Sequence, residues 1–197
     1  MTQPDPAQSL AKDLAFLVEI DRLKSIVRAS PLLDRSRKEN SAEHSWHVAM
    51  YALILADKAE GDIDIGRVIS MLLIHDIVEI DAGDMPLHGG GDKAAQEKAE
   101  AAAADRLFSL LSPEKAEAFL ALWHEFEAGE TPDARFARCV DRLQPVLGNL
   151  ETGGGTWTEM SVTHDRVVER CGPPIERGSP ALWAHAAARV KAYFDEN

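Results

Sequence analysis

The residues with the clearest chemical potential lie between Leu72 and Asp84, where His75 and Asp76 stand side by side in an apolar run. Burying an unpartnered polar group costs roughly 2–7 kcal/mol, and burying a charge costs more. A divalent cation held by both side chains would offset this cost, because imidazole and carboxylate are both good metal ligands. On a helix, Glu79 lies one turn beyond the pair and faces the same space. The stretch therefore predicts a metal site, while a helix C-terminus with a solvated acidic edge is the alternative.

Three other positions are candidates for the same site. Asp84 follows on a glycine-containing turn before Pro86. His44 and His47 lie one turn apart at the start of an expected helix, and spacing alone does not choose between them or exclude two ordinary core or surface residues. Asp141 lies among small residues on a later expected helix, which favours close approach by another element. An exposed aspartate on the shoulder of that helix is the equally weighted alternative.

Cations suited to an anionic substrate lie on the N-terminal side of these candidates. Arg28 falls in the last turn of a helix expected over residues 10–29, where a charge that simply favours the helix C-terminus is the alternative. The formal net charge of the chain is −12, from 21 basic and 33 acidic residues. Against that background, the best candidate for an anion-receiving edge is the cluster of Arg35, Arg37 and Lys38. A solvated loop is the more common explanation of such a cluster.

Apolar residues at helical spacing predict the elements that position these side chains. Asn40 with Glu43 three residues later resembles a capping box at the start of one helix, with Ser41 as the alternative start. No strand-like alternation persists, so the chain is predicted to be all-α. A proline-rich break is expected at residues 172–174. The expected helices cover residues 10–29, 40–59, 65–80, 93–111, 113–129, 161–171 and 180–194, with another beginning at Pro132.

Composition and charge narrow the possible classes of protein. A length of 197 residues suits one domain, and 45% hydrophobic with 27% charged residues is ordinary for a soluble globular protein. The negative charge disfavours polymeric nucleic acid and acidic membrane surfaces as partners. No apolar run approaches the roughly 20 residues needed to cross a bilayer, and residues 1–9 do not resemble a signal peptide. Cys139 and Cys171 do not make a disulfide framework, so a cytoplasmic protein is expected.

The constellation His44, His75-Asp76 and Asp141, on three separate expected helices, resembles the HD-domain metal-dependent phosphohydrolase superfamily. The resemblance covers roughly residues 14–150. It implies a helical bundle with a central metal site, and one HD domain over residues 1–197 with a core of about 14–150 and a C-terminal helical extension over 151–197. Five motifs stand in the order seen in the 5′-deoxynucleotidase-like branch: Pro31-Leu32, Glu39-Asn40, Glu43-His44-Ser45, His75-Asp76-x-x-Glu79 and Gly83-Asp84-x-Pro86.

The resemblance implies four ligands for one divalent metal ion, namely His44, His75, Asp76 and Asp141. It favours His44 over His47 because His44 stands in the Glu-His-Ser context. The ion would be Mn²⁺, Co²⁺, Fe²⁺, Zn²⁺ or Mg²⁺, since all of these accept a mixed nitrogen and oxygen ligand set. Such an ion would lower the pKa of a bound water and neutralise charge that builds up on the phosphoryl oxygens.

The resemblance also implies the substrate residues and the reaction. Arg28 would contact the substrate phosphate, and Glu79 and Asp84 would assist the attacking water. The implied reaction removes phosphate from nucleoside 5′-monophosphates. Ala29-Ser30 replaces the bulky aromatic residue of the deoxynucleotide-selective member, so the sugar preference is open. The three cations that could help to bind the phosphate are Arg35, Arg37 and Lys38.

Two other functions and the oligomeric state remain open at this point. The chain could hydrolyse another nucleotide phosphoester or a pyrophosphate, or it could be a non-catalytic, metal-stabilised nucleotide sensor. The resemblance implies a homodimer. An apolar stripe with Leu182, Trp183 and Phe194 could supply the dimer contact, although packing within the chain explains this stripe equally well.

Overall fold

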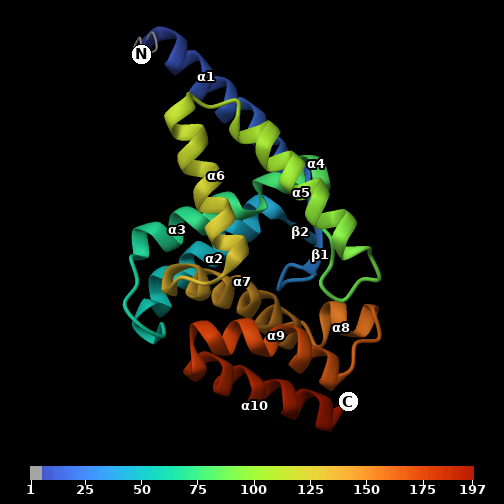
Figure 1. The fold of residues 1–197 in the computed structure, drawn as a ribbon. Helices are drawn as coiled ribbons and strands as arrows, with labels where there is room; N and C mark the ends of the chain where they lie inside the picture. Colours follow the sequence, from blue (N-terminus) through green and yellow to red (C-terminus); the bar gives the residue numbers. More distant parts are fainter. Residues whose placement is uncertain (1–5) are drawn as a thin grey trace.

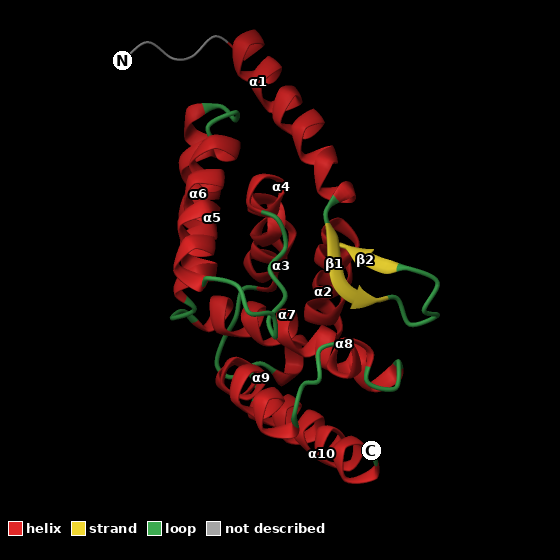
Figure 2. Ribbon diagram, turned by 90° about the vertical axis from the view of Figure 1, so that its right-hand side faces the viewer, coloured by secondary structure: helices red, strands yellow, loops and turns green. Residues whose placement is uncertain are grey.

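The computed structural model describes residues 6–197, which form a bundle of helices with one small hairpin (Figures 1 and 2). The predicted all-α fold class is confirmed. Residues 1–5, with which the predicted domain begins, lie outside the described part of the chain. In chain order the elements are α1 (Pro6–Glu19), the 3₁₀ helix η1 (Ile20–Ser25), β1 (Val27–Pro31), β2 (Lys38–Asn40), α2 (Ser41–Leu55), the 3₁₀ helix η2 (Ala56–Lys58), α3 (Ile65–Ile74), the 3₁₀ helix η3 (His75–Val78), α4 (Glu79–Ala82), α5 (Lys93–Phe108), α6 (Pro113–Ala128), α7 (Pro132–Glu151), α8 (Gly155–Glu159), α9 (His164–Gly178) and α10 (Pro180–Glu196).

The hairpin of β1 and β2 is the main departure from the expected elements. Its strands are antiparallel, with Val27 opposite Asn40 and Pro31 opposite Lys38. The expectation of a helix through residue 29, with Arg28 in its last turn, was therefore wrong. The β-branched Val27 favours an extended backbone, and a proline disfavours the α-region for the residue before it. These local preferences end the helix early and place Arg28 on a strand.

Local capping fixes several helix starts, and the one at α2 was predicted from the sequence. The Asn40 side chain accepts a hydrogen bond from the Glu43 N–H, and the Glu43 carboxylate accepts one from the Asn40 N–H, so the capping box of α2 is confirmed. The hydroxyl oxygens of Thr131 and Ser179 cap α7 and α10 by accepting from a backbone N–H of the first turn, and each residue is followed by a proline at the first helical position.

The expected break at residues 172–174 was wrong, because α9 continues through Pro173 and Pro174 to Gly178. A proline inside a helix removes a backbone hydrogen bond, so tertiary packing has to compensate. Helix α9 packs along both α7 and α10, and buries Val167 and Ile175 completely. The end of α9 also comes so near to α7 that a Cβ atom at Gly178 would collide with the Arg135 carbonyl oxygen.

Helix α7 lies in the middle of the molecule and connects two parts of the core (Figure 1). One apolar cluster joins α7 to α2 and α3, and another joins it to α8, α9 and α10. A third cluster packs α1 against α5 and α6. The predicted ligand Asp141 on α7 therefore lies where the parts of the bundle meet. None of the helices within residues 6–197 combines the length and apolar character needed to cross a bilayer.

Candidate metal centre

Three of the predicted ligands converge from separate elements. His44 on α2, His75 at the start of η3 and Asp141 on α7 have ligand atoms that all lie within 4.8 Å of one another. Asp141 Oδ1 is 2.9 Å from His44 Nε2 and 3.5 Å from His75 Nε2. The fourth predicted ligand, Asp76, places Oδ1 3.0 Å from His75 Nε2. The fold therefore gathers all four side chains into one site.

The hydrogen bonds of the two imidazole rings prepare them to bind a cation. His44 Nδ1 donates to Gln144 Oε1 over 3.1 Å, and His75 Nδ1 donates to the Leu72 carbonyl oxygen over 2.8 Å. A neutral ring that donates through Nδ1 keeps the lone pair of Nε2 for a ligand. His75 Nε2 is also buried without a hydrogen-bond partner among the described residues. This donor set fits a divalent metal ion.

Charges within the cluster are strongly interdependent. Burial by itself would raise the pKa of Asp141, but the contacts with His44 and His75 hold it well below its ordinary value. Burial would lower the pKa of His75, whereas the Asp76 and Asp141 carboxylates raise it well above the ordinary histidine value. The carboxylates thus create a strongly cation-attracting position between the rings, which a divalent ion can occupy instead of protons.

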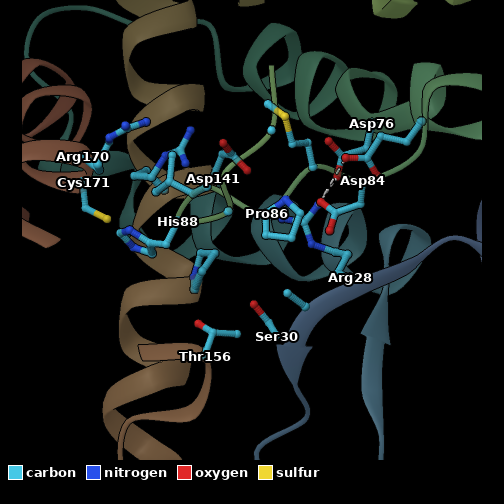
Figure 3. Close-up of a pocket in the computed structure, with 18 of the residues that line it drawn as sticks. Arg28, Ser30, Asp76, Asp84, Pro86, His88, Asp141, Thr156, Arg170 and Cys171 are labelled. Carbon is cyan, nitrogen blue, oxygen red and sulfur yellow. Dashed lines mark hydrogen bonds and ion pairs between the residues drawn. The ribbon is translucent and has the colours of Figure 1, made fainter. Parts of the chain in front are cut away.

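Arg28 and three carboxylates form the acidic side of the adjoining pocket, where Figure 3 shows Arg28 beside Asp76 and Asp84. Arg28 Nη1 lies 2.8 Å from Asp76 Oδ2, 3.7 Å from Glu79 Oε1 and 3.8 Å from Asp84 Oδ1. The Ser41 hydroxyl donates a hydrogen bond to the other Glu79 oxygen, Oε2. The spacing argument that aimed Glu79 at the space beside Asp76 therefore agrees with the structure.

The surroundings raise the pKa of two of these carboxyl groups and lower the pKa of the third. Burial, followed by the neighbouring Asp76 and Asp84 charges, raises the pKa of Glu79 to about 9. Burial also raises the pKa of Asp84. Burial acts in the same direction on Asp76, but His75 and then Arg28 lower its pKa to about 2. Carboxyl groups whose environments push their pKa values apart are typical of acid–base sites.

The fold does not bring the cluster Arg35, Arg37 and Lys38 to this pocket. Arg35 donates to the Thr152 carbonyl oxygen, Arg37 pairs with Glu43, and Lys38 pairs with Glu159. The three side chains line a separate hollow with residues of the α7–α8 turn and α8. The hairpin turn carries them away from the metal ligands, so the expectation that they assist Arg28 is corrected.

Several residues at or near the metal centre were not expected from sequence patterns. Gln144 follows Asp141 by three residues on α7, and this spacing was an available signal that both share one face. Its Nε2 donates to Glu39 Oε1 over 3.2 Å, and lies 3.3 Å from His47 Nδ1. No local pattern pointed to the residues that the loop after α4 and helix α9 add to the pocket, which include His88 and Arg170.

Replacing Gln144 with leucine is expected to weaken metal binding about 10–100-fold, the range typical for partners that orient a metal ligand. The change removes the acceptor that holds His44 Nδ1 and leaves the ring free to turn or to change tautomer. Competition with a chromogenic chelator measures the affinity, and circular dichroism checks the fold. Gln8→Leu, at an exposed position on α1, is the matched control. Equal affinities of the Gln144 variant and the control would contradict the positioning role.

Comparison with known proteins gives consistent results along most of the chain. Residues 20–183 match the family model described as HD domain. The 5′-deoxynucleotidase HDDC2 of Xenopus laevis is 27% identical over 139 residues, which are 70% of this chain and 68% of that protein. The 5′-deoxynucleotidase Ent638_2835 of Enterobacter sp. (strain 638) is 33% identical over 144 residues, covering 69% of this chain and 71% of that protein. The chain thus matches about two thirds of the length of these curated relatives.

Solved structures extend the comparison. A crystal structure of a predicted metal-dependent phosphohydrolase from Magnetospirillum magnetotacticum superposes with a TM-score of 0.89 at 52% identity, and the match covers 94% of this chain and 95% of that one. A conserved hypothetical protein from Pyrococcus furiosus gives a TM-score of 0.61 at 21% identity over 91% of this chain and 99% of its own. The second similarity concerns the fold alone.

Proposed function

The chain belongs to the HD-domain family, and we propose on that basis that its metal centre removes phosphate from nucleoside 5′-monophosphates. The observation that carries the proposal is one pocket in which a His-His-Asp cluster stands beside Arg28 and two carboxyl groups of raised pKa, Glu79 and Asp84. The curated relatives with 5′-deoxynucleotidase names support the choice of substrate.

The proposed roles follow from position and charge. His44, His75, Asp76 and Asp141 hold one divalent ion, whose bound form would polarise the phosphoryl group and make a water more acidic. Arg28 is half-buried and permanently charged, because the surrounding carboxylates raise its pKa although burial opposes this. Its guanidinium can therefore donate charge-assisted hydrogen bonds to the phosphate oxygens.

Glu79 and Asp84 are the groups proposed to handle the proton of the attacking water. Both flank Arg28, and both have carboxyl groups that favour holding a proton in this environment. A carboxyl group with a raised pKa is a better base in its ionised form than an ordinary one. The products are a nucleoside and inorganic phosphate.

Phosphate release from a panel of nucleoside monophosphates tests the proposal. The protein is stripped of metal and reloaded separately with Mn²⁺, Co²⁺, Fe²⁺, Zn²⁺ and Mg²⁺, with Asp76→Ala as the blank. Metal-dependent release from 5′-monophosphates is the expected result, and comparison of ribo- and deoxyribonucleotides measures the sugar preference. Release only from diphosphate-linked or cyclic nucleotides would favour the alternative hydrolase. Binding without any turnover would favour a nucleotide sensor.

Two wider statements belong to the same proposal. Residues 1–197 form one HD domain, with residues 151–197 as a helical extension that packs on α7 through α9 and α10. The protein works in the cytoplasm, which agrees with the two buried, unpaired cysteines Cys139 and Cys171. Measuring the cooperativity of unfolding tests the first statement, and cell fractionation tests the second.

A homodimer is also proposed, with its contact on α2 and not on the apolar stripe of α10. Leu182, Trp183 and Phe194 pack into the core beside α7 and α9, so this stripe is used within the chain. An exposed apolar stripe is present instead on α2 and includes Trp46 and Ile54, which are 63% and 70% exposed. Light scattering is expected to give the mass of a dimer for the unmodified protein and of a monomer for Ile54→Asp, with Leu33→Asp in the hairpin turn as the control. A monomeric unmodified protein would contradict the proposal.

A further inference from the structure

The pocket at the metal centre has two chemically different sides. Asp76, Asp84 and Arg28 lie on one side of Asp141 in Figure 3, and Arg170 and its neighbours lie on the other. The second side is built by α7, α9 and the loop after α4, and lies outside the residues that hold the metal or handle the water. Its lining residues include Arg142, Arg170, His88 and Cys171.

Two arginines on this second side lack a close ion-pair partner among residues 6–197. Within residues 6–197, neither Arg142 nor Arg170 makes a hydrogen bond or a close ion pair, and Arg142 Nε is buried without any acceptor. Arg28 Nε also has no hydrogen-bond partner among the described residues, but Arg28 Nη1 pairs with Asp76, and Arg138 donates to the Phe126 and Glu127 carbonyl oxygens. A buried guanidinium nitrogen without a partner is costly, so a missing acceptor is indicated.

His88 lies on the same side of the pocket as these arginines. It is buried, and its Nδ1 has no hydrogen-bond partner among the described residues. Burial lowers its pKa to about 4, and the charges of Arg166, Arg142 and Arg170 contribute to the same shift. Three guanidinium groups therefore act on one neutral imidazole. In a chain with a net charge of −12, this is a local reversal of sign.

Both sides open into the same cavity. Its volume is about 410 Å³, within the roughly 300–1,000 Å³ that is usual for small-molecule sites. Asp141 of the metal centre and Arg142 of the positive side both line this cavity, from consecutive positions on α7. One small ligand can therefore contact both.

We propose that Arg142 and Arg170 form a second anion site, and that the preferred substrates are nucleotides with a second phosphate group, such as nucleoside 3′,5′-bisphosphates. This inference rests on the proposed function, because it assigns the 5′-phosphate to the metal centre. The planar guanidinium group suits phosphate because it donates two parallel hydrogen bonds. The neutral His88 ring can add a third. A neutral nucleobase at this position would supply no charge to pair with either guanidinium group.

The affinity ratio between adenosine 3′,5′-bisphosphate and adenosine 5′-monophosphate tests the second site. Calorimetry on metal-loaded Glu79→Gln protein measures both affinities while hydrolysis is suppressed. The bisphosphate is expected to bind about 10-fold more tightly or better, the gain usual for a charged hydrogen-bonded group. In protein that also carries Arg142→Gln and Arg170→Gln, the ratio is expected to fall to near one. Arg189→Gln, which removes a paired arginine outside the pocket, is the matched control and keeps the ratio.

The outcomes separate this inference from the proposed function. A ratio near one before the arginines are changed would overturn the second site, and so would a ratio that survives both changes. The single variant Arg170→Gln, at an exposed position, is expected to lower the ratio even where the double variant does not fold. If the unmodified protein releases phosphate from no nucleotide, the proposed function fails. The ratio can then be measured on the unmodified protein itself and still decides the second site.

Discussion

Replacing Asp141 with asparagine is expected to empty the metal centre and to lower phosphate release by about 10³-fold or more. A bound metal contributes several kcal/mol of transition-state stabilisation, and each 1.36 kcal/mol corresponds to a factor of ten in rate. Asp141 Oδ1 lies near the Nε2 atoms of both His44 and His75, so its negative charge acts at the position where both rings would bind the ion. An amide of the same shape keeps the packing but loses that charge. Metal content by mass spectrometry and turnover by phosphate release measure the two effects.

The control for this change is Asp105→Asn, which removes an exposed aspartate on α5. It is expected to retain both metal and turnover. Full metal occupancy of the Asp141 variant would show that the cluster does not depend on this carboxylate. Loss of turnover with the metal retained would instead give Asp141 a role in the chemistry and not in metal binding.

Replacing Glu79 with glutamine is expected to reduce kcat about 10²–10⁴-fold while metal binding is retained, the range usual for a group that transfers a proton. Glu79 is buried beside Asp76 and Asp84, and its pKa is raised to about 9. Glutamine preserves the size of the side chain and can still contact the Ser41 hydroxyl, but it cannot accept a proton. Turnover, metal content and nucleotide affinity are measured on the same preparation.

This variant also separates the hydrolase from the sensor. A sensor requires no proton transfer, so nucleotide affinity would persist and there would be no turnover to lose. Glu117→Gln, at an exposed position on α6, is the control for the loss of one carboxylate. Undiminished turnover in the Glu79 variant would leave Asp84 as the remaining proton acceptor, which Asp84→Asn then tests.

The amino-acid sequence was enough to predict most of the helices, the capping box at Asn40 and a set of candidate metal ligands. The capping box at Asn40 and the proline-led starts of α6 and α7 depend on residues within one turn of each other, so they can be recognised without tertiary contacts. His75, Asp76 and Glu79 form one short run whose helical spacing fixes a common direction. The order of the motifs then indicated that His44 and Asp141 complete the set.

Which charged residues share a pocket depends on tertiary packing. Arg28 reaches the carboxylates from a strand and not from a helix end, while Arg35, Arg37 and Lys38 turn away although they follow closely in sequence. Arg142 and Arg170 face one cavity because α9 packs along α7, despite the two prolines that suggested a break. Local spacing encodes one face of one helix, whereas a pocket depends on how separate helices pack. That packing is set by the whole core and has no local signature.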